Sequence, residues 1–318
     1  MKIAVTIDTE EDNWGDYSCE SFGIENIKKI PALQKLFDEF NIIPTYLVTY
    51  PVATNKESVN ILKEILQQSK CEIGLHCHPW STPPFEEERN AYNSMLCNLP
   101  YDLQYKKITT LHEAIEKNIG IIAKSFRAGR WGYNETVLKV IRDLDYGIDT
   151  SVTPFTDWTA YYGPDFSCMT PEPYRFSETE IFKNSKHGEL IEIPATIGYL
   201  QRDFNLCKLV DRYLTSRLGR RLRLKGILEA MRVLNKVWLS PEVSDSGQMI
   251  KLTKVLQKKN YKIINLFFHT TYLRAGLSYC VKKKEDEVRF SNSMKEYFTY
   301  ANENGINSIR LSDARNII

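Results

Sequence analysis

The chain has 318 residues and a formal net charge of +2, with 42% hydrophobic, 12% aromatic and 26% charged residues. These values are typical of a globular protein with a large core, and they give no overall reason to expect a nucleic-acid partner. No run approaches the roughly 18 apolar residues of a membrane-spanning helix, and the first residues, MKIAVTID, lack the features of a secretory signal. The seven cysteines are scattered without a CxxC pair, so we expect free thiols and a cytoplasmic location.

Short β-branched runs alternate with helical periodicity along almost the whole chain. The pattern predicts strands at Lys2–Asp8, Pro44–Thr49, Cys71–His76, Ser125–Gly129, Gly147–Val152, Leu190–Ala195, Tyr261–His269 and Asn307–Leu311. It predicts helices at Pro31–Phe40, Glu57–Gln68, Gln104–Lys124, Asn134–Asp143, Leu206–Val237, Asp245–Lys259 and Ser291–Asn304. This alternation predicts an α/β fold, a distorted β/α barrel of about seven parallel strands with the helices outside.

The chain shows no internal repeat and no Gly/Ser-rich linker, so we predict one domain over residues 1–318. Two segments are too long to be simple connections, Cys77–Leu103 and Thr153–Lys186. We expect both to fold over one rim of the barrel as loops that face the substrate.

The chemically unusual residues gather where four predicted strands end. These segments are Thr6–Asp12 (TIDTEED), Gly74–Trp80 (GLHCHPW), Phe126–Gly132 (FRAGRWG) and Leu266–Thr270 (LFFHT). In a β/α barrel the carboxyl ends of all strands open onto one face, where active sites lie. We therefore expect these four segments to converge on one site.

Two of the five histidines, His76 and His78, stand two positions apart at a strand end. Successive strand side chains alternate between faces, so both imidazoles can point the same way and chelate a divalent metal. An acidic ligand completes a catalytic zinc site, and Asp8 and Glu10 have the same two-residue spacing on the same rim. The alternative is a pair of hydrogen-bonded loop histidines, but the combination of HxH with DxE favours a metal.

Asp8 directly follows an apolar run, where burying an unpaired carboxylate is costly. A cationic partner is therefore expected, and Arg127 or Arg130 at another strand end can supply it. Both arginines can equally be ordinary surface cations. The neighbouring Glu11 and Asp12 are interpreted as a solvated turn.

His269 closes the apolar run Ile263–Phe268. It can be a hydrogen-bonded core histidine or a residue that caps a strand end. Beside a metal and a carboxylate, however, an imidazole is well suited to be a general acid. We therefore predict that His269 belongs to the same site.

At these positions the chain resembles the polysaccharide deacetylase family, the NodB-homology carbohydrate esterases, from Lys2 to about Asp313. Members of that family have a distorted β/α barrel and remove N- or O-acetyl groups from sugars with a divalent metal. The segment Thr6–Glu10 resembles the first family motif. Its acidic–x–acidic spacing, in place of the commoner adjacent Asp pair, implies Asp8 as the catalytic base and Glu10 as a metal ligand.

The second family motif carries two histidines four positions apart, but here the residue four after His76 is Trp80. The second ligand is therefore reassigned to His78, and the sequence His-x-His-Pro-Trp resembles a cytoplasmic, polysaccharide deacetylase-like branch. The segment Phe126–Trp131 resembles the third motif, whose arginine orients the base and whose aromatic residue lines the groove. Phe268–Thr270 resembles the last motif, which supplies the catalytic histidine.

The resemblance implies a hydrolase that removes an N-acetyl group, with an O-acetyl group as the less favoured alternative, from a sugar or glycan of cell-surface polysaccharide metabolism. Zinc is the expected metal. Arg127 would hold the base, backbone N–H groups near Arg130 would stabilise the oxyanion, and His269 would protonate the departing amine. Expected substrate contacts, each of which can instead be packing, are Trp80, Trp131 and Trp158. Two rival functions stay open, a metal-dependent amidohydrolase of cyclic amides or ureides and a glycan-binding barrel without turnover.

Residues 211–238 hold eight basic and two acidic side chains. Their charge of +6, within a total of +2, leaves −4 for the rest of the chain. Apolar positions keep roughly helical spacing through this segment. The favoured interpretation is a barrel helix with a solvated basic face. The alternative is a basic amphipathic surface that binds anionic lipid at the inner membrane.

Overall fold

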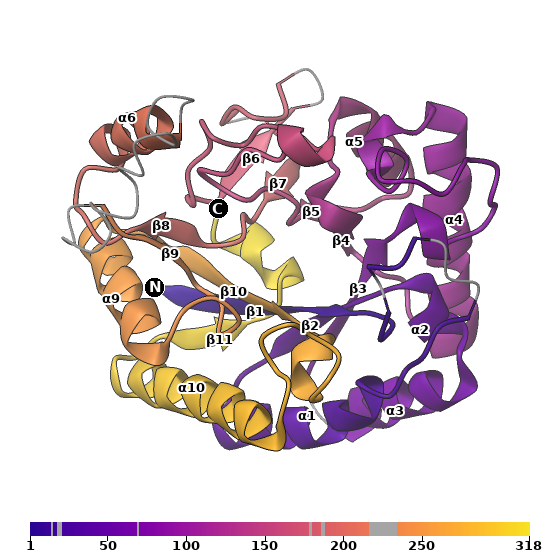
Figure 1. Cartoon of the computed structure of the whole chain (residues 1–318), viewed down its shortest axis with the longest axis horizontal. Coiled ribbons are helices and arrows are strands. Elements are labelled where there is room, and N and C mark those ends of the chain that lie inside the picture. Colours follow the sequence, from indigo (N-terminus) through magenta and orange to yellow (C-terminus); the bar gives the residue numbers. More distant parts are fainter. Residues whose placement is uncertain (14, 18–20, 69, 178–179, 186–187, 216–233) are drawn as a thin grey trace.

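The computed structural model describes residues 1–13, 15–17, 21–68, 70–177, 180–185, 188–215 and 234–318. A curled, mostly parallel sheet with the strand order β10-β1-β2-β3-β4-β5-β7-β6 forms its centre, and helices surround it (Figure 1). β11 pairs with β1 off this path, and β8 and β9 form a separate two-stranded sheet. The strands are β1 (Lys2–Thr9), β2 (Pro44–Val48), β3 (Glu72–Cys77), β4 (Ser125–Ala128), β5 (Ile148–Asp149), β6 (Tyr174–Phe176), β7 (Leu190–Glu192), β8 (Ile197–Tyr199), β9 (Lys236–Trp238), β10 (Ile263–His269) and β11 (Asn307–Ile309).

The curl of the sheet brings its two ends close together. Beyond β5, Ala195 N–H donates to Val152 O at 3.0 Å, and the next residue, Thr196, donates its N–H to Asn265 O on β10 at 3.1 Å. Apart from β6, which is antiparallel to β7, the strands along the main path pair in parallel. The α/β class and the distorted barrel expected from the sequence are thus confirmed.

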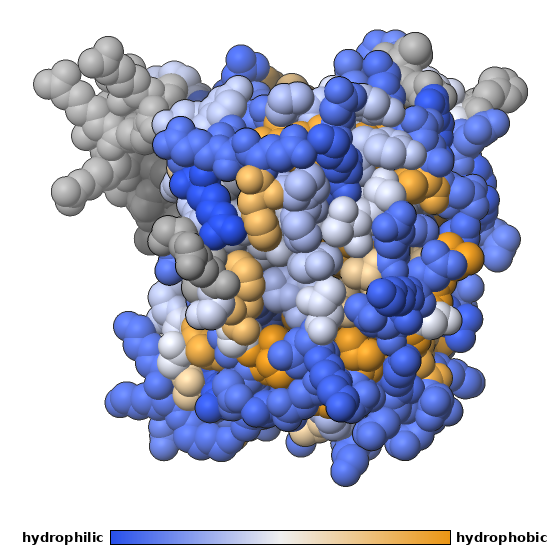
Figure 2. Space-filling view, turned by 90° about the vertical axis from the view of Figure 1, so that its right-hand side faces the viewer, coloured by the Kyte–Doolittle hydropathy of each residue, from blue (hydrophilic) through white to orange (hydrophobic). Residues whose placement is uncertain are grey.

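The helices are α1 (Ile30–Glu39), α2 (Tyr50–Thr54), α3 (Lys56–Gln68), α4 (Tyr101–Ile119), α5 (Glu135–Asp143), α6 (Phe204–Thr215), α9 (Ser246–Lys258) and α10 (Lys284–Glu303). Several of their ends follow from local chemistry. The Asn134 side chain accepts from Thr136 N and Val137 N at the start of α5. Gly120 adopts φ 89° after α4, where it donates to two carbonyls of the last turn and ends the helix before the predicted residue Lys124. Hydrophilic side chains cover most of the helical side shown in Figure 2, as amphipathic outer helices require.

Alternation along the strands sorts the inside of the sheet into layers. Ala4, Thr6 and Asp8 share one face of β1, whereas the residues between them pack toward the helices. The layer at the amino ends is apolar and consists of Ala4, Ile148, Ile191, Ile193, Ile263, Ile309, Leu311 and Ala314. Polar side chains follow in the middle, and acidic residues and histidines lie at the carboxyl ends. The register places Asp8 directly beside His269.

The sequence-based prediction for the region after β8 is wrong in part. Within the helix expected at Leu206–Val237, the described residues form α6, Phe204–Thr215, at its beginning and strand β9, which pairs antiparallel with β8, at its expected end. Most of the basic segment 211–238, residues 216–233, lies outside the described residues. Within the described part of the chain, no helix has the length and hydropathy needed to cross a membrane. The six cysteines there are free thiols.

Candidate active site

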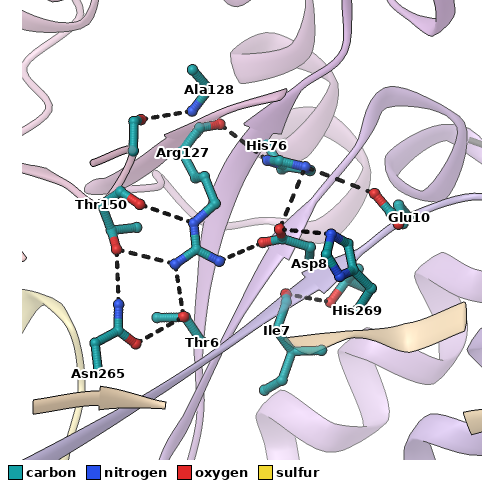
Figure 3. Close-up of polar contacts among 12 residues, drawn as sticks. Thr6, Ile7, Asp8, Glu10, His76, Arg127, Ala128, Thr150, Asn265 and His269 are labelled. Atoms are coloured by element: carbon teal, nitrogen blue, oxygen red, sulfur yellow. Dashed lines mark hydrogen bonds and ion pairs between the residues drawn. The ribbon is translucent and has the colours of Figure 1, made fainter. Parts of the chain in front are cut away.

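Asp8 and Arg127 form a buried ion pair at the carboxyl ends of β1 and β4. Arg127 Nη1 donates to Asp8 Oδ1 at 2.6 Å, and its other donors reach Thr6 Oγ1, Thr150 Oγ1 and Thr150 O (Figure 3). The two threonine hydroxyls are bridged by Asn265, so the middle layer of the barrel supports the guanidinium. Burial alone would raise the pKa of Asp8, but Arg127 and the nearby histidines lower it to about 2. Asp8 is therefore an ionised carboxylate at neutral pH.

Glu10, His76 and His78 converge beside this pair. Glu10 Oε2 lies 3.8 Å from His76 Nε2 and 3.6 Å from His78 Nε2. One potential ligand atom from each of the three residues lies within 4.8 Å of the other two. All three side chains are buried, and their spacing suits the carboxylate–imidazole ligand set of a catalytic zinc site.

The donor set fits a divalent cation. Both carboxylate oxygens of Glu10 are buried without a hydrogen-bond partner among the described residues, and burial raises its pKa well above the ordinary range. His76 Nδ1 contacts Arg127 O at 3.1 Å, which fixes the ring with Nε2 toward Glu10. Burial also lowers the pKa of His76 to about 3, so its imidazole is neutral, the form that ligates metals. A cation between these groups would offset the cost of burying the Glu10 carboxylate.

Glu11 departs from the sequence-based interpretation as a solvated turn. It is fully buried, its Oε2 accepts from Thr49 Oγ1 at 2.8 Å, and its Oε1 lies 3.6 Å from His78 Nδ1. The carboxylate therefore lies on the side of the His78 ring opposite Glu10. Such acidic neighbours orient metal-ligating histidines. The expectation of a solvated turn also fails for Asp12, because its carboxylate accepts hydrogen bonds from Glu25 N–H and Asn26 N–H.

His269 lies between Asp8 and a residue that the sequence analysis missed, Glu242. His269 Nε2 is 3.5 Å from Asp8 Oδ2, and its Nδ1 is 2.9 Å from Glu242 Oε1. Although burial disfavours the charged imidazole, Glu242 and Glu10 raise the pKa of His269 to about 10. His269 is thus an imidazolium in this arrangement. Glu242 follows Pro241 in a polar loop after β9, and no local motif indicated its role.

Two predicted site residues make contacts other than those expected. The Arg130 guanidinium does not pair with Asp8, because it donates to Ser94 Oγ and to Ala91 O at the pocket rim. Trp80 is 1% exposed and stacks on His78 with ring centroids 4.3 Å apart, so it cannot stack on a sugar as predicted. Trp80 instead supports the His78 ring from behind.

The turn between β4 and the pocket has a strained backbone. Arg130 and Trp131 adopt φ of 53° and 62°, in the left-handed region that side chains disfavour. Gly129 precedes them where a Cβ would lie 2.5 Å from Cys77 O, so only glycine permits this close approach to the end of β3. The turn brings Arg130 and Trp131 to the pocket wall.

The acidic residues and histidines open into a pocket of about 530 Å³. Both long loops contribute to it, as the sequence predicted. Its lining comprises Asp8, Glu10, His76, His78, Met95, Ala128, Arg130, Trp131, Trp158, Tyr161, Trp238, Glu242, Val243, Phe267, His269, Tyr272 and Tyr279. Trp131 and Trp158 therefore lie where a substrate could contact them, in contrast to Trp80.

No protein-family model matches the chain, and no curated protein does. Solved structures with a similar fold include the following two. One is a proposed polysaccharide deacetylase from Mycobacterium smegmatis, with 13% identity over 100% of this chain and 89% of that chain, at a TM-score of 0.57. The other is a 4-α-glucanotransferase from Thermococcus litoralis, with 14% identity over 100% of this chain and 40% of that chain, at a TM-score of 0.54.

At these identities the comparisons show the fold alone. The fold expected from the resemblance to polysaccharide deacetylases is thereby confirmed. Because the second structure is described as a glucanotransferase, the fold does not by itself choose one reaction. The choice rests on the residues of the pocket.

Proposed function

We propose that this protein is a metal-dependent deacetylase that hydrolyses an N-acetyl group on a sugar or glycan. One observation carries the proposal. The Glu10–His76–His78 cluster, the Asp8–Arg127 ion pair and the Glu242–His269 pair all meet at one pocket. Together they supply a candidate cation site, an ionised carboxylate and an imidazolium, which are the groups that a metal-assisted hydrolysis of an amide uses.

Glu10, His76 and His78 would hold the metal, and zinc suits this set of one carboxylate and two imidazoles. A bound divalent cation supplies a Lewis acid that polarises the acetyl carbonyl. Glu11 and Trp80 hold the His78 ring, and the Arg127 carbonyl holds the His76 ring. The chain therefore fixes both imidazoles independently of the metal.

Asp8 acts as the base in this proposal. Its Oδ1 is engaged by Arg127, so Oδ2 is the atom that accepts a proton from water as the water oxygen attacks the acetyl carbon. The low pKa keeps Asp8 ionised and ready to accept. Because its pKa is low, Asp8 does not retain the proton, which passes from Oδ2 to the neutral Nε2 of His269, 3.5 Å away, and so restores both groups.

His269 acts as the acid. The imidazolium gives its Nε2 proton to the sugar nitrogen while the bond between that nitrogen and the acetyl carbon breaks. The products are acetate and the free amine. Glu242 stabilises the charged ring through Nδ1 and keeps Nε2 directed toward Asp8 and the pocket. Backbone N–H groups near Arg130 are expected to face the developing oxyanion.

Acetate release from acetylated sugars, with zinc added or removed by a chelator, tests the proposal. Asp8→Asn and His269→Ala should retain zinc and lose roughly 100- to 10,000-fold in rate, the usual contribution of a general base or acid. Glu10→Gln, His76→Ala and His78→Ala should instead lose zinc while remaining folded. Full zinc occupancy in His78→Ala would show that the reassigned ligand is wrong.

The same measurements address the two rival functions. Turnover of cyclic ureides without acetate release would indicate the other class of amidohydrolase, and sugar binding without turnover would indicate a glycan-binding barrel. The expected cytoplasmic location and peripheral contact with anionic lipid through 211–238 stay predictions. Sedimentation with anionic vesicles tests the lipid contact, which should be lost when Arg220, Arg221 and Arg223 are replaced by Ala.

A further inference from the structure

The candidate site lies at the base of a pocket whose size suits a small ligand. Its volume of about 530 Å³ falls within the roughly 300–1,000 Å³ of pockets that bury most of a ligand's surface. A pocket of this class buries most of the surface of a small ligand, which suits part of a short glycan. A polysaccharide bound through its interior would need an open groove on both sides of the reacting residue.

One wall is built from the two long loops, which bind one another. Asn98 Nδ2 donates to Tyr92 O and to Tyr162 O, both at 2.9 Å, and the rings of Tyr92 and Tyr162 pack edge to face. Gly163 lies close to Met95, because a Cβ atom added at Gly163 would be 3.1 Å from the Met95 Cε atom. The first loop therefore fixes the second against the pocket.

The second loop is also braced from within. Phe155 N–H donates to Phe166 O and Phe166 N–H donates to Thr156 O, as in a short antiparallel ladder. Trp158 Nε1 donates to Thr153 Oγ1 at 2.7 Å, which fixes the indole at the pocket wall. Lys236 Nζ, on β9, donates to Phe155 O at 2.6 Å. A wall held at so many points keeps its shape when a ligand enters.

The outer lining of the pocket is aromatic and almost uncharged. Among the described residues that line the pocket, the one charged side chain beyond the acidic residues and histidines at its base is Arg130, whose guanidinium already donates to Ser94 and Ala91. Aromatic faces suit the apolar faces of sugar rings, whereas a phosphate or carboxylate would need a dedicated cation. The lining therefore favours a neutral sugar.

We propose that the pocket receives one terminal residue of a short, uncharged acetylated glycan, end-on, and excludes the interior of a polysaccharide chain. This inference rests on the proposed deacetylase function for its reaction, but its binding part can be measured separately. It assigns Tyr161 to the wall that sets the length of the substrate.

The first test uses the N-acetylglucosamine disaccharide, tetrasaccharide and hexasaccharide with the zinc-loaded protein. The second-order rate constant per chain should not depend on length, and mass spectrometry of the products should locate the lost acetyl group at one chain end. Acetyl groups lost from interior residues, or a rate constant that rises steadily with length, would overturn the inference and leave the deacetylase function intact.

The second test is binding of the same sugars to the metal-free protein, followed by tryptophan fluorescence. The Kd should be the same for the disaccharide and the hexasaccharide. Such binding, together with no acetate release by the zinc-loaded protein, would disprove the proposed function and support the pocket inference, whereas failure of every sugar to bind would overturn the inference. A uridine-diphosphate-linked N-acetylglucosamine should bind no more tightly than the free sugar, and tighter binding would contradict the neutral substrate.

A matched pair of variants tests the wall. Tyr161 lines the pocket, whereas Tyr213 on α6 is not among its lining residues and takes no part in the contact between the two loops, and both residues are 58% exposed. Tyr161→Ala should raise the ratio of hexasaccharide to disaccharide rate constants by about tenfold, a typical effect of one pocket-lining group on discrimination. Tyr213→Ala should leave this ratio unchanged. Equal ratios in both variants would show that this wall does not set the length.

Discussion

Arg127 donates to Asp8 Oδ1 through Nη1 at 2.6 Å, between two strands whose residues are 119 positions apart. Because this oxygen is engaged, Oδ2 is the one that faces His76 at 3.9 Å and His269 at 3.5 Å. The guanidinium is itself held by Thr6 and Thr150 from the layer below. The direction in which Asp8 can exchange a proton is thus set by residues that never reach the pocket.

Replacing Arg127 by Met should lower the free energy of unfolding by about 3–5 kcal/mol, the usual cost of leaving one partner of a buried ion pair alone. Urea unfolding at neutral pH measures it. Adding Asp8→Asn to Arg127→Met should recover part of the loss, because the unpaired buried charge is then removed. If the double variant is less stable than Arg127→Met alone, the unpaired Asp8 carboxylate does not account for the lost free energy of unfolding.

Glu11→Gln should weaken zinc binding by about 10- to 100-fold, the usual effect of removing an acidic neighbour of a ligating histidine. The reason is that Glu11 Oε1 lies 3.6 Å from His78 Nδ1. Thr49→Val, which removes the hydroxyl that donates to Glu11, should act in the same direction and more weakly. Competition with a zinc-sensitive dye gives the affinity, with the exposed Glu57→Gln as the control. An affinity equal to that of the wild type would leave Glu11 with no influence on the site.

The placement of the site could be predicted from the sequence because strand periodicity and strand ends are local properties. Asp8, His76 and His269 each close an apolar run, and parallel strands bring such ends to one rim. The HxH spacing also holds, since His78 remains extended one residue beyond β3. The catalytic and ligand roles of these residues stay predictions.

The residues that the sequence did not reveal depend on contacts between distant segments. Glu11 is interpretable only beside Thr49 and His78, and Glu242 only beside His269. The three residues of β9 are too few for a periodic signal, and their pairing with β8 crosses a long connection. Tryptophan side chains often contact sugars, but Trp80 is buried against His78, and this packing could not be predicted from the residue type.

Glu242→Gln should move the basic limb of the pH–rate profile of acetate release to lower pH. The Glu242 carboxylate helps to raise the pKa of His269 to about 10, and the neutral amide removes this contribution. The imidazolium, which is the acid in the proposed reaction, would then be lost at a lower pH. Val243→Ala, at the next lining position, should leave the limb in place. An unchanged limb in Glu242→Gln would show that Glu242 does not control the charge of His269.

Asp149 and Glu192 form a second buried carboxyl pair, outside the pocket, at paired positions of β5 and β7. Asp149 accepts from Ser151 Oγ at 2.6 Å, and Glu192 accepts from Val152 N at 3.0 Å. Burial raises the pKa values of both groups, and the proximity of Asp149 raises that of Glu192 further, well above its ordinary 4.5. The folded protein therefore keeps a proton on the pair at pH values at which the unfolded chain has released it.

Since unfolding then releases protons, the free energy of unfolding should fall as the pH rises above about 4.5 and through the raised pKa of the pair. Glu192→Gln removes one of the two carboxyl groups, so its unfolding free energy should fall less over the same range. Urea midpoints between pH 5 and 8, in steps of about one unit, give the two slopes, with the exposed Glu189→Gln as a nearby control. If the free energy of unfolding falls with pH at the same slope in the wild type and in Glu192→Gln, the pair is not the cause of the pH dependence. A shallower slope in Glu192→Gln alone, with that of Glu189→Gln unchanged, would assign it to the proton shared by Asp149 and Glu192.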